Sequence, residues 1–181
     1  MDIITGGKDR VLDMTRASVL DTAWDWHVGG KDNAYDYIER FYEHNTPFFW
    51  CIEDDVIVGV FGFEIHPITG GWETTVFLMP EFRGGGFNIY RLILSITAFQ
   101  KLKTKLVASI RADNKRSKKA LQKLYTLGLP KSARSVMFEQ WRDNGAGADC
   151  YIYDLTQLDT TDLYVDAKHL RTVYTALLPI L

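Results

Sequence analysis

Apolar and polar positions change their period several times along the first half of the chain, and each change predicts a new element. Spacings of three and four at residues 11–20 and 34–43 predict two helices. A period of two takes over at residues 48–53 and 56–66, with the aspartates between these runs predicting the turn of an antiparallel hairpin. Residues 72–79 predict a further strand.

The second half alternates between the two periods. Helices are predicted at residues 87–102 and 114–127, the second one stopped by Gly128 and Pro130, with a short strand at 105–110 between them. Residues 135–141 and 149–155 predict two strands, and residues 161–176 predict a helix within a C-terminal extension, 158–181. Strand-helix-strand passages need crossovers, so residues 1–181 are expected to form one α/β domain around a mixed sheet.

Composition and cysteine usage narrow the class of protein. A chain of 181 residues with 46% hydrophobic and 24% charged side chains is ordinary for one globular domain. Cys51 and Cys150 form no CxxC pair and lie in apolar, strand-like segments, which favours reduced and buried thiols. The four histidines stand singly, so no metal site is expected. No leader pattern and no run of about 18 apolar residues occurs, so we expect a cytoplasmic protein without a membrane partner.

Charge is divided unevenly between two regions. Residues 1–75 hold 14 acidic and 5 basic side chains, whereas residues 97–134 hold 11 basic side chains and the single acid Asp113. The basic region predicts an anionic partner, and the alternative that charge alone favours is a solvated lysine face on a helix. Nucleic acid ranks last among the partners, because the cations gather on one helix without interleaved aromatic residues.

The segment PEFRGGGFNIYRL places three glycines between an apolar run and a helix. Bare backbone before a helix exposes several N–H groups where the helix dipole also favours negative charge, so a phosphate group is the expected ligand. Two phosphate-binding patterns are excluded, because Phe87 and Asn88 follow Gly86 in place of Lys-Ser/Thr, and Ile89 stands where the dinucleotide pattern needs a small residue. The alternative is a glycine-rich turn without a ligand.

FLMPEFRGGGFN resembles the acyl-coenzyme A motif of the GNAT superfamily of N-acetyltransferases, in which an apolar strand leads into Arg/Gln-x-x-Gly-x-Gly/Ala. Arg83, Gly84, Gly86 and Asn88 fall on that pattern, and Asn88 departs from its small last residue. The element order over about residues 11–155 is also similar. The resemblance implies a GNAT-like mixed, mostly antiparallel sheet flanked by helices, with a cofactor cleft at the splayed central strands.

A second segment, NKRSKKALQKL at residues 114–124, resembles the Asn-x-x-Ser helix that lies beside the cofactor in this family. The resemblance implies acetyl-CoA as cosubstrate, with the loop amides on its diphosphate and the preceding strand paired with its pantetheine arm. A 3'-phosphate nearby would offset the repulsion among the cations of this helix. The implied cofactor-binding residues are Phe77, Leu78, Met79, Arg83, Gly84, Gly85, Gly86, Phe87, Asn88, Asn114, Ser117 and Lys118.

The implied reaction is direct transfer of an acyl group to a primary amine of a small molecule or protein. Such an attack needs a neutral amine, so a base must accept a proton and an acid can protonate the departing thiolate. The resemblance implies Glu73 as the base, six residues before Met79 on the predicted strand, and Tyr125 as the acid. A solvated glutamate and a packed tyrosine are the alternatives, and Glu64 and His66 are reserve candidates for the base.

Acceptor binding is implied for the loop at residues 24–30 and the hairpin at 142–148, and the acidic first half suggests a cationic amine. The competing interpretation keeps the fold but makes the chain a binding or structural module, of the kind that phages encode, without turnover. Asn88 departs from the family's glycine motif, and Tyr125 is displaced from the register of the family's helix. Both departures leave room for this competing interpretation. The amphipathic C-terminal segment fits docking on the core or on the second subunit of a homodimer.

Overall fold

The computed structural model describes residues 1–6, 47–54, 56–78, 82–84, 86–112, 114–128, 137–143 and 148–180. The chain divides into two compact units. The first unit consists of residues 1–64, 75–85 and 171–181, and the second of residues 65–74 and 86–170. The helices predicted at 11–20 and 34–43 lie outside the described residues, as does the predicted acceptor loop at 24–30.

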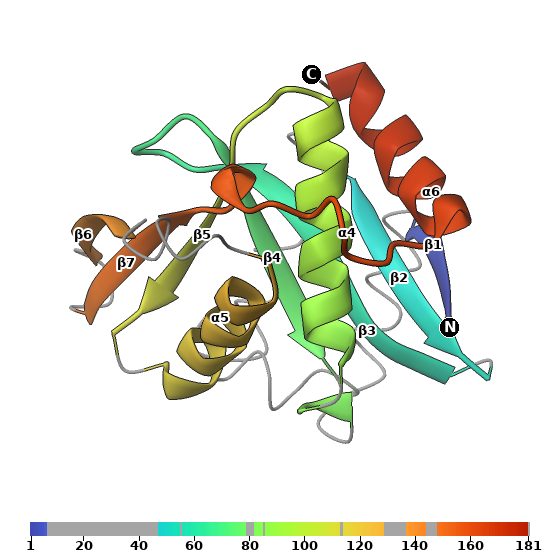
Figure 1. The fold of residues 1–181 in the computed structure, drawn as a ribbon, viewed down its shortest axis with the longest axis horizontal. Coiled ribbons are helices and arrows are strands. Elements are labelled where there is room, and N and C mark those ends of the chain that lie inside the picture. Colours follow the sequence, from blue (N-terminus) through green and yellow to red (C-terminus); the bar gives the residue numbers. More distant parts are fainter. Residues whose placement is uncertain are drawn as a thin grey trace. The chain divides into compact units, whose positions relative to one another are not determined.

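Three antiparallel strands, β1 (Asp2–Gly6), β2 (Phe48–Glu53) and β3 (Val56–Ile65), lie side by side in the first unit (Figure 1). The β2–β3 hairpin confirms the prediction from the period of two, and Asp54 takes a positive φ of 49° in its turn. β1 was not predicted. It is a short strand with one buried side chain, Ile3, so its sequence carries too little alternation to be recognised.

Aromatic side chains fill the core of the first unit. Phe49 and Phe61 stack with their ring centroids 5.0 Å apart, and Phe63 meets both rings edge-on at 5.9 Å. Trp50 is fully buried, and a Cβ added at Gly6 would lie 1.5 Å from its Nε1. Gly6 is therefore required by packing, because the indole already occupies the space of any side chain there.

Strand pairing in the second unit is mixed. The first two residues of β4 (Trp72–Leu78) pair in parallel with β5 (Leu106–Arg111), which is the crossover predicted for the intervening helix α4 (Phe87–Lys101). β7 (Ala148–Asp154) pairs antiparallel with both β5 and β6 (Met137–Asp143), giving the order β4-β5-β7-β6. Strand pairing in the protein is mostly antiparallel, as the predicted fold class requires.

Helices α4 and α5 (Lys115–Gly128) confirm two predicted helices within one residue at each end. The apolar stripe of α4 is buried except at Ile89, and the Phe99 ring lies 6.3 Å from that of Trp72. Burial of each large apolar side chain contributes roughly 1.5–3 kcal/mol, so this stripe holds α4 on the start of β4.

The C-terminal segment is irregular before it becomes helical, with one turn closed by the bond from the Leu163 N–H to the Thr160 carbonyl. A short 3-10 turn, η3 (Leu155–Gln157), follows β7, and α6 (Ala167–Leu177) begins six residues later than predicted, before the final turn η4 (Leu178–Ile180). The segment between η3 and α6 crosses α4 (Figure 1), where the Gln100 side chain donates to the carbonyls of Thr156 and Leu158 at 3.1 and 2.5 Å. These bonds hold the part of the segment that follows η3 on α4 of the same chain.

Other predictions concern single residues and long apolar stretches. Cys51 is buried, as predicted, whereas the side chain of Cys150 lies outside the described part of the structure. Among the described helices, none combines the length and the apolar character that crossing a bilayer requires. Within the described ranges, no three His, Cys, Asp or Glu side chains gather as a metal ion would need.

Candidate functional site

The start of α4 offers unsatisfied backbone donors. Gly86 is its N-cap, with φ −67° and ψ −11°, and no side chain caps the helix there. Among the described residues, the amides of Phe87, Asn88 and Ile89 have no hydrogen-bond partner, and the first turn carries no acidic side chain. These donors and the helix dipole together favour an anion at this position.

The two described glycines of the loop are required for different reasons. Gly84 has φ +92°, which residues with a side chain rarely adopt, so the backbone itself requires a glycine there. Gly86 has an ordinary helical φ, and a Cβ added to it would meet no described atom within 4 Å. Neither its conformation nor a described neighbour requires a glycine at position 86. Gly85 lies outside the described residues.

Arg83 folds the loop back onto the end of β4 within the first unit. Its Nε donates a hydrogen bond of 3.1 Å to the carbonyl of Leu78, the last residue of the strand. This bond uses one of the main-chain groups that the resemblance assigned to the pantetheine arm. Phe77 lies in β4 with its side chain outside the described set, and Met79 lies outside the described residues altogether.

Glu73 stands where the parallel pairing of β4 with β5 ends. The register pairs Glu73 with Val107, and the Glu73 Oε1 then accepts the backbone N–H of Ser109 at 2.9 Å. The carboxylate therefore completes the hydrogen bonding of β5 where the ladder from β4 stops. The Ser109 hydroxyl oxygen beside it is buried and has no partner among the described residues, a condition that costs about 1–3 kcal/mol unless a ligand or water meets it.

A buried arginine joins β4 to the start of α4, and sequence reasoning missed it. Arg91 is 2% exposed, and its Nε and Nη2 both donate to the Asn88 Oδ1, at 3.2 and 2.9 Å. Its Nη1 donates to the Thr74 hydroxyl at 2.5 Å. The network brings Asn88 and the neighbour of Glu73 together through one side chain. The available signal was a charged residue at the edge of the apolar stripe of α4, three positions after a polar amide.

The predicted residues of α5 use their polar atoms within the protein. The Asn114 Oδ1 accepts the Ser117 backbone N–H at 3.0 Å, so Asn114 caps the helix. The Lys118 ammonium donates to the Ala112 carbonyl at 2.6 Å and lies 4.7 Å from the centre of the Tyr151 ring. The side chain of Tyr125 lies outside the described set. These contacts give Asn114 and Lys118 structural roles in addition to the roles predicted for them in the cofactor site.

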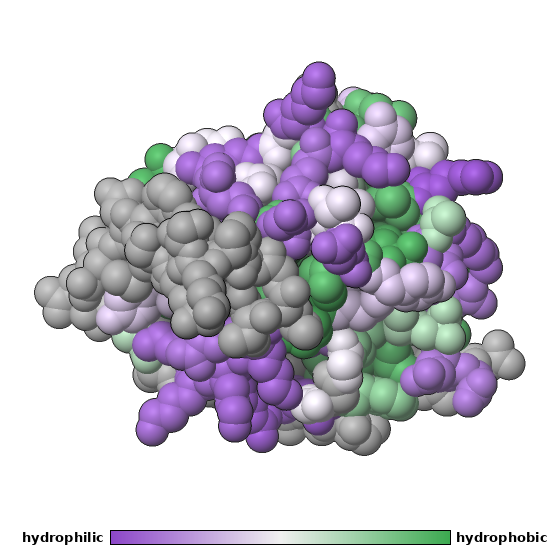
Figure 2. Space-filling view, viewed as in Figure 1, coloured by the Kyte–Doolittle hydropathy of each residue, from purple (hydrophilic) through white to green (hydrophobic). Residues whose placement is uncertain are grey.

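The exposed face of α5 is basic. Its first turn contains no acidic side chain, and hydrophilic side chains gather over this helix at the lower left of Figure 2. The exposed cations are Lys115, Arg116, Lys119 and Lys123. Positive charge at a helix start is unfavourable by itself, so an anion beside this turn would stabilise it.

His66, one of the reserve candidates for the base, has a structural role in its own turn. The side chain is 1% exposed, and its Nδ1 accepts the backbone N–H groups of Ile68 at 3.3 Å and Thr69 at 3.2 Å. The imidazole therefore holds the turn between β3 and β4.

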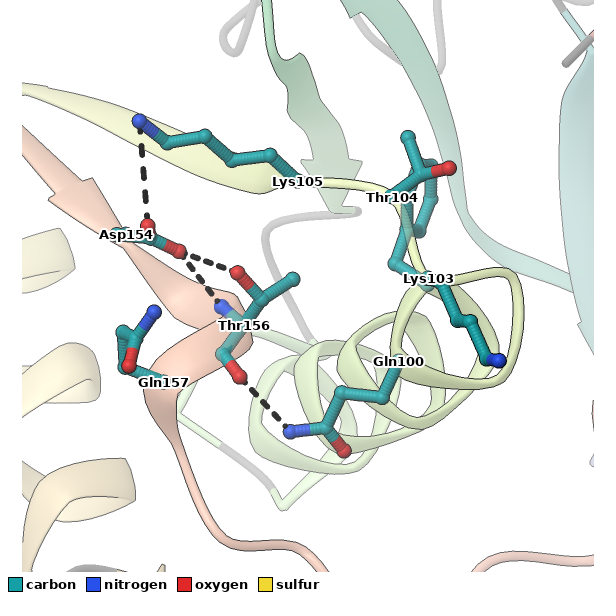
Figure 3. A pocket seen from close by; sticks show the side chains of 8 residues that line it. Gln100, Lys103, Thr104, Lys105, Asp154, Thr156 and Gln157 are labelled. Carbon is teal, nitrogen blue, oxygen red and sulfur yellow. Dashed lines mark hydrogen bonds and ion pairs between the residues drawn. The ribbon is translucent and has the colours of Figure 1, made fainter.

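A shallow hollow of about 400 Å³ lies at the opposite end of α4 (Figure 3). It is about 20 Å along the helix from Gly86, as the rise of 1.5 Å per residue requires. Its polar groups satisfy one another, because Asp154 accepts the Thr156 N–H at 3.0 Å and lies 3.9 Å from the Lys105 ammonium. This hollow shares no residue with the predicted site. Its lining residues are Phe99, Gln100, Lys103, Thr104, Lys105, Asp154, Thr156 and Gln157.

Solved structures share the fold over most of the chain. A ribosomal-protein-alanine N-acetyltransferase from Brucella melitensis matches with a TM-score of 0.57 and 16% identity, covering 85% of this chain and 98% of its own. A spermidine N-acetyltransferase chimera of SpeG from Vibrio cholerae and hSSAT gives 0.56 and 13%, covering 87% and 98%. RimL, a ribosomal L7/L12 α-N-protein acetyltransferase solved with coenzyme A, gives 0.58 and 16%, covering 84% and 91%.

Sequence comparison supports the same family. No curated protein matches the chain. The family model described as "Acetyltransferase (GNAT) domain" matches residues 13–125, which is more than half of the chain and includes the glycine loop, α4 and most of α5. With the fold matched and the glycine loop leading into an open helix start, this chain belongs to the GNAT acetyltransferase family.

Proposed function

We propose that this protein transfers the acetyl group of acetyl-CoA directly to a primary amine. The observation that carries the proposal is the start of α4, where Gly86 leaves room for a ligand and three described amides lack partners. A diphosphate fits these donors in charge and geometry. Family membership supports the same cosubstrate, and RimL was solved with coenzyme A.

In the proposed cofactor site, loop residues 83–88 hold the diphosphate. The main chain of residues 77–79 pairs with the pantetheine arm, and Asn114, Ser117 and Lys118 lie beside the nucleotide. The exposed cations of α5 support a 3'-phosphate nearby, because its charge would offset their repulsion. We also propose that residues 1–181 act as one domain, because β3 and β4 each contribute residues to both compact units.

In the proposed reaction the amine nitrogen bonds to the thioester carbonyl carbon, and the carbon–sulfur bond breaks as the thiolate leaves. Glu73 accepts the proton that the amine loses, and Tyr125 protonates the thiolate. The hydrogen bond from the Ser109 amide fixes the Glu73 carboxylate at the opening between β4 and β5, which is where a base would need to be held. The unpartnered Ser109 hydroxyl beside it offers a donor for the acyl carbonyl or a bridging water.

A cationic amine is the proposed acceptor, because residues 1–75 carry 14 acidic and 5 basic side chains. Two of the similar structures are enzymes named for a ribosomal-protein alanine and for spermidine. Polyamines and peptide amino termini are therefore the first acceptors to test, with aminoglycosides as a third class.

The test measures cosubstrate binding before turnover. Saturating acetyl-CoA should raise the melting temperature of the full chain, whereas ATP and NAD should not, because a ligand that binds only the folded state stabilises it by mass action. Release of the free thiol from acetyl-CoA is then followed with each class of amine. A melting temperature that acetyl-CoA leaves unchanged at saturation would remove the proposal.

A second candidate is a GNAT-fold binding module that does not turn over. The observation that favours it is the hydrogen bond between Glu73 and the Ser109 amide, since a carboxylate that completes a strand has a sufficient structural reason to be present. Thermal stabilisation by acetyl-CoA together with no thiol release for any tested amine would support the module. A rate of thiol release that is higher with an amine than without it would exclude the module.

A further inference from the structure

The hydroxyl of Ser109 is a buried polar group without a hydrogen-bond partner among the residues that the structure describes. Native proteins satisfy nearly all of their buried polar groups, so each exception requires a physical reason. Packing does not supply one here, because alanine would occupy the same place on β5 without leaving a hydroxyl unpaired. The reason is therefore to be sought in what the hydroxyl does when a ligand is bound.

Ser109 lies just beyond the parallel ladder between β4 and β5. The last pair of that ladder is Glu73 with Val107, and Ser109 is two residues further along β5. Its backbone N–H donates to the Glu73 Oε1 at 2.9 Å, so a side chain takes the place of a strand carbonyl. The amide and the hydroxyl belong to one small residue, which brings the hydroxyl within a few ångströms of the carboxylate.

Ser109 is partly exposed, although its hydroxyl oxygen is not. The exposed surface of the residue therefore comes from its main chain and its Cβ. A serine side chain has three staggered positions about the Cα–Cβ bond, and rotation among them moves the oxygen without moving the strand. A change of rotamer is thus the movement by which the hydroxyl can meet a ligand on the accessible side of the residue.

The position beside a proposed base favours one kind of chemistry for this hydroxyl. A serine hydroxyl can donate one hydrogen bond and accept others, so it can receive one proton while it passes on another. A donor that only polarised the acyl carbonyl would need no carboxylate nearby, whereas a proton relay does. The bond from the Ser109 amide holds that carboxylate by Oε1 alone.

We propose that the Ser109 hydroxyl relays the proton from the acceptor amine to Glu73. The inference rests on the proposed function, because this proton is the one that the amine must lose before it attacks. The amine nitrogen gives its proton to the Ser109 Oγ as the Oγ–H proton moves to the Glu73 Oε2. The serine ends as a neutral hydroxyl and the carboxylate as a carboxylic acid. The electron pair left on nitrogen then forms the bond to the thioester carbonyl carbon.

Ser109→Ala tests the relay through its opposite effects on stability and rate. The hydroxyl has no described partner to lose, so the melting temperature should stay equal or rise. The kcat for the best amine should fall by about ten-fold, which is less than for loss of the base, because a water molecule can carry the proton through the vacated space. The KM for acetyl-CoA should not change. Thermal melting and steady-state thiol release measure these quantities.

Two further variants at these positions sharpen the test. Ser109→Thr keeps the hydroxyl and suits a strand, so it should restore most of the rate that Ser109→Ala loses. In the Glu73→Gln background, Ser109→Ala should lower kcat by less than about two-fold, because the relay no longer has an acceptor for its proton.

Ser95→Ala is the matched control. It removes a buried serine hydroxyl from α4, where the Oγ donates to the Arg91 carbonyl at 2.8 Å, and it should leave kcat unchanged. A fall in kcat for Ser95→Ala as large as that for Ser109→Ala would show that the loss does not depend on the place of the hydroxyl beside Glu73, and would overturn the relay.

Three other results would overturn the relay while leaving the proposed function intact. A kcat of Ser109→Ala equal to that of the wild type would show that the hydroxyl takes no part in the reaction. A clear fall in its melting temperature would give the hydroxyl a structural role. A ten-fold loss that persists in the Glu73→Gln background would assign the hydroxyl to the acyl carbonyl instead. Wild-type protein that binds acetyl-CoA but releases no thiol with any amine would remove the proposed transferase function, and the relay with it.

Discussion

The two ends of α4 are built in opposite ways. At its carboxyl end the backbone is closed, because Leu102, Lys103 and Thr104 donate their N–H groups to carbonyls of the last turn, and Lys101 complements the dipole. At its amino end Gly86 provides no side-chain cap, three described amides lack partners, and a buried arginine adds positive charge.

The difference separates an end that its own chain completes from the end that we propose binds the diphosphate. A helix terminus that only needs to be stable is completed by its own chain, as the carboxyl end of α4 is by the amides of residues 102–104. A terminus that leaves donors unsatisfied gives up about 1 kcal/mol or more that a capping side chain would supply. Binding of an anion recovers that free energy, which is the physical basis for placing the diphosphate there.

The largest expected effect concerns Glu73, the proposed base. Glu73→Gln keeps an oxygen that can accept the Ser109 amide, so the fold and coenzyme A affinity should persist. Loss of the proton acceptor should lower kcat by about 10²-fold or more, in line with general base catalysis. Steady-state kinetics with the best amine found would measure it. A kcat equal to that of the wild type would remove Glu73 from the mechanism and leave its structural use.

Gly86→Asp should separate stability from binding at the open end. Aspartate is a good N-cap, so the melting temperature without ligand should stay equal or rise. The same carboxylate would repel the diphosphate and fill its space, so affinity for coenzyme A should fall by about 100-fold, or about 2.7 kcal/mol.

The neutral control is Gly86→Asn, which caps the helix without a charge and should lose less affinity. Calorimetric titration and thermal melting of the three proteins give both quantities. If Gly86→Asp leaves the affinity for coenzyme A unchanged, the diphosphate binds elsewhere. The two ends of α4 would then not differ in ligand binding.

Gln100→Ala tests the closed end. The change removes the side-chain donor to the carbonyls of Thr156 and Leu158 and one of the two hydrogen bonds of the Thr160 hydroxyl, so the free energy of unfolding should fall by about 1–3 kcal/mol. Coenzyme A affinity should not change, since the amide lies about 20 Å along the helix from Gly86. Chemical denaturation measures the first quantity and titration the second. A loss of affinity comparable to that of Gly86→Asp would show that the ends are not independent.

The elements with strong periodicity could be predicted from sequence. The stripe of α4 and the alternation of β2 and β3 gave boundaries within one residue, because buried faces enforce those periods. β1 was missed since a short edge strand with one buried side chain has no such face. The start of α6 was predicted too early because residues 158–166 are apolar enough to suggest a helix, yet hydrogen bonds to Tyr90, Thr97 and Gln100 hold them in an irregular conformation.

The candidate site could be predicted where backbone chemistry defines it. The glycines and the helix start could be recognised in the sequence, because neither a missing side chain nor a helix dipole depends on contacts with distant segments. The bond from Ser109 to Glu73 and the network around Arg91 could not be predicted, because both join segments far apart in the chain. Only the fold shows that the residue at 88 has a partner at 91 and a support on β4.

The smallest expected effect concerns Asp166, in the part of the C-terminal segment that contacts Tyr90 near the amino end of α4. Asp166 caps α6, and the pKa of its carboxyl lies below the ordinary value, first because the His169 N–H donates to it and then because the Lys168 N–H does. A carboxyl with a lowered pKa in the folded state contributes stability that is fully present above the unfolded-state pKa of about 4 and is lost as the pH falls through the folded-state value.

Asp166→Ala should therefore lower the melting temperature at neutral pH by less than Gln100→Ala does, and the difference from the wild type should disappear in acid. Asp166→Asn keeps an oxygen that can accept the same amides but does not titrate, so its difference from the wild type should be smaller at neutral pH. The Asp166 backbone N–H still donates to the Tyr90 hydroxyl in both variants, so the segment stays on α4. Thermal melting across the acidic range measures these differences. A difference for Asp166→Ala that persists far below the unfolded-state pKa would mean that packing, and not the charged cap, holds α6 at the open end.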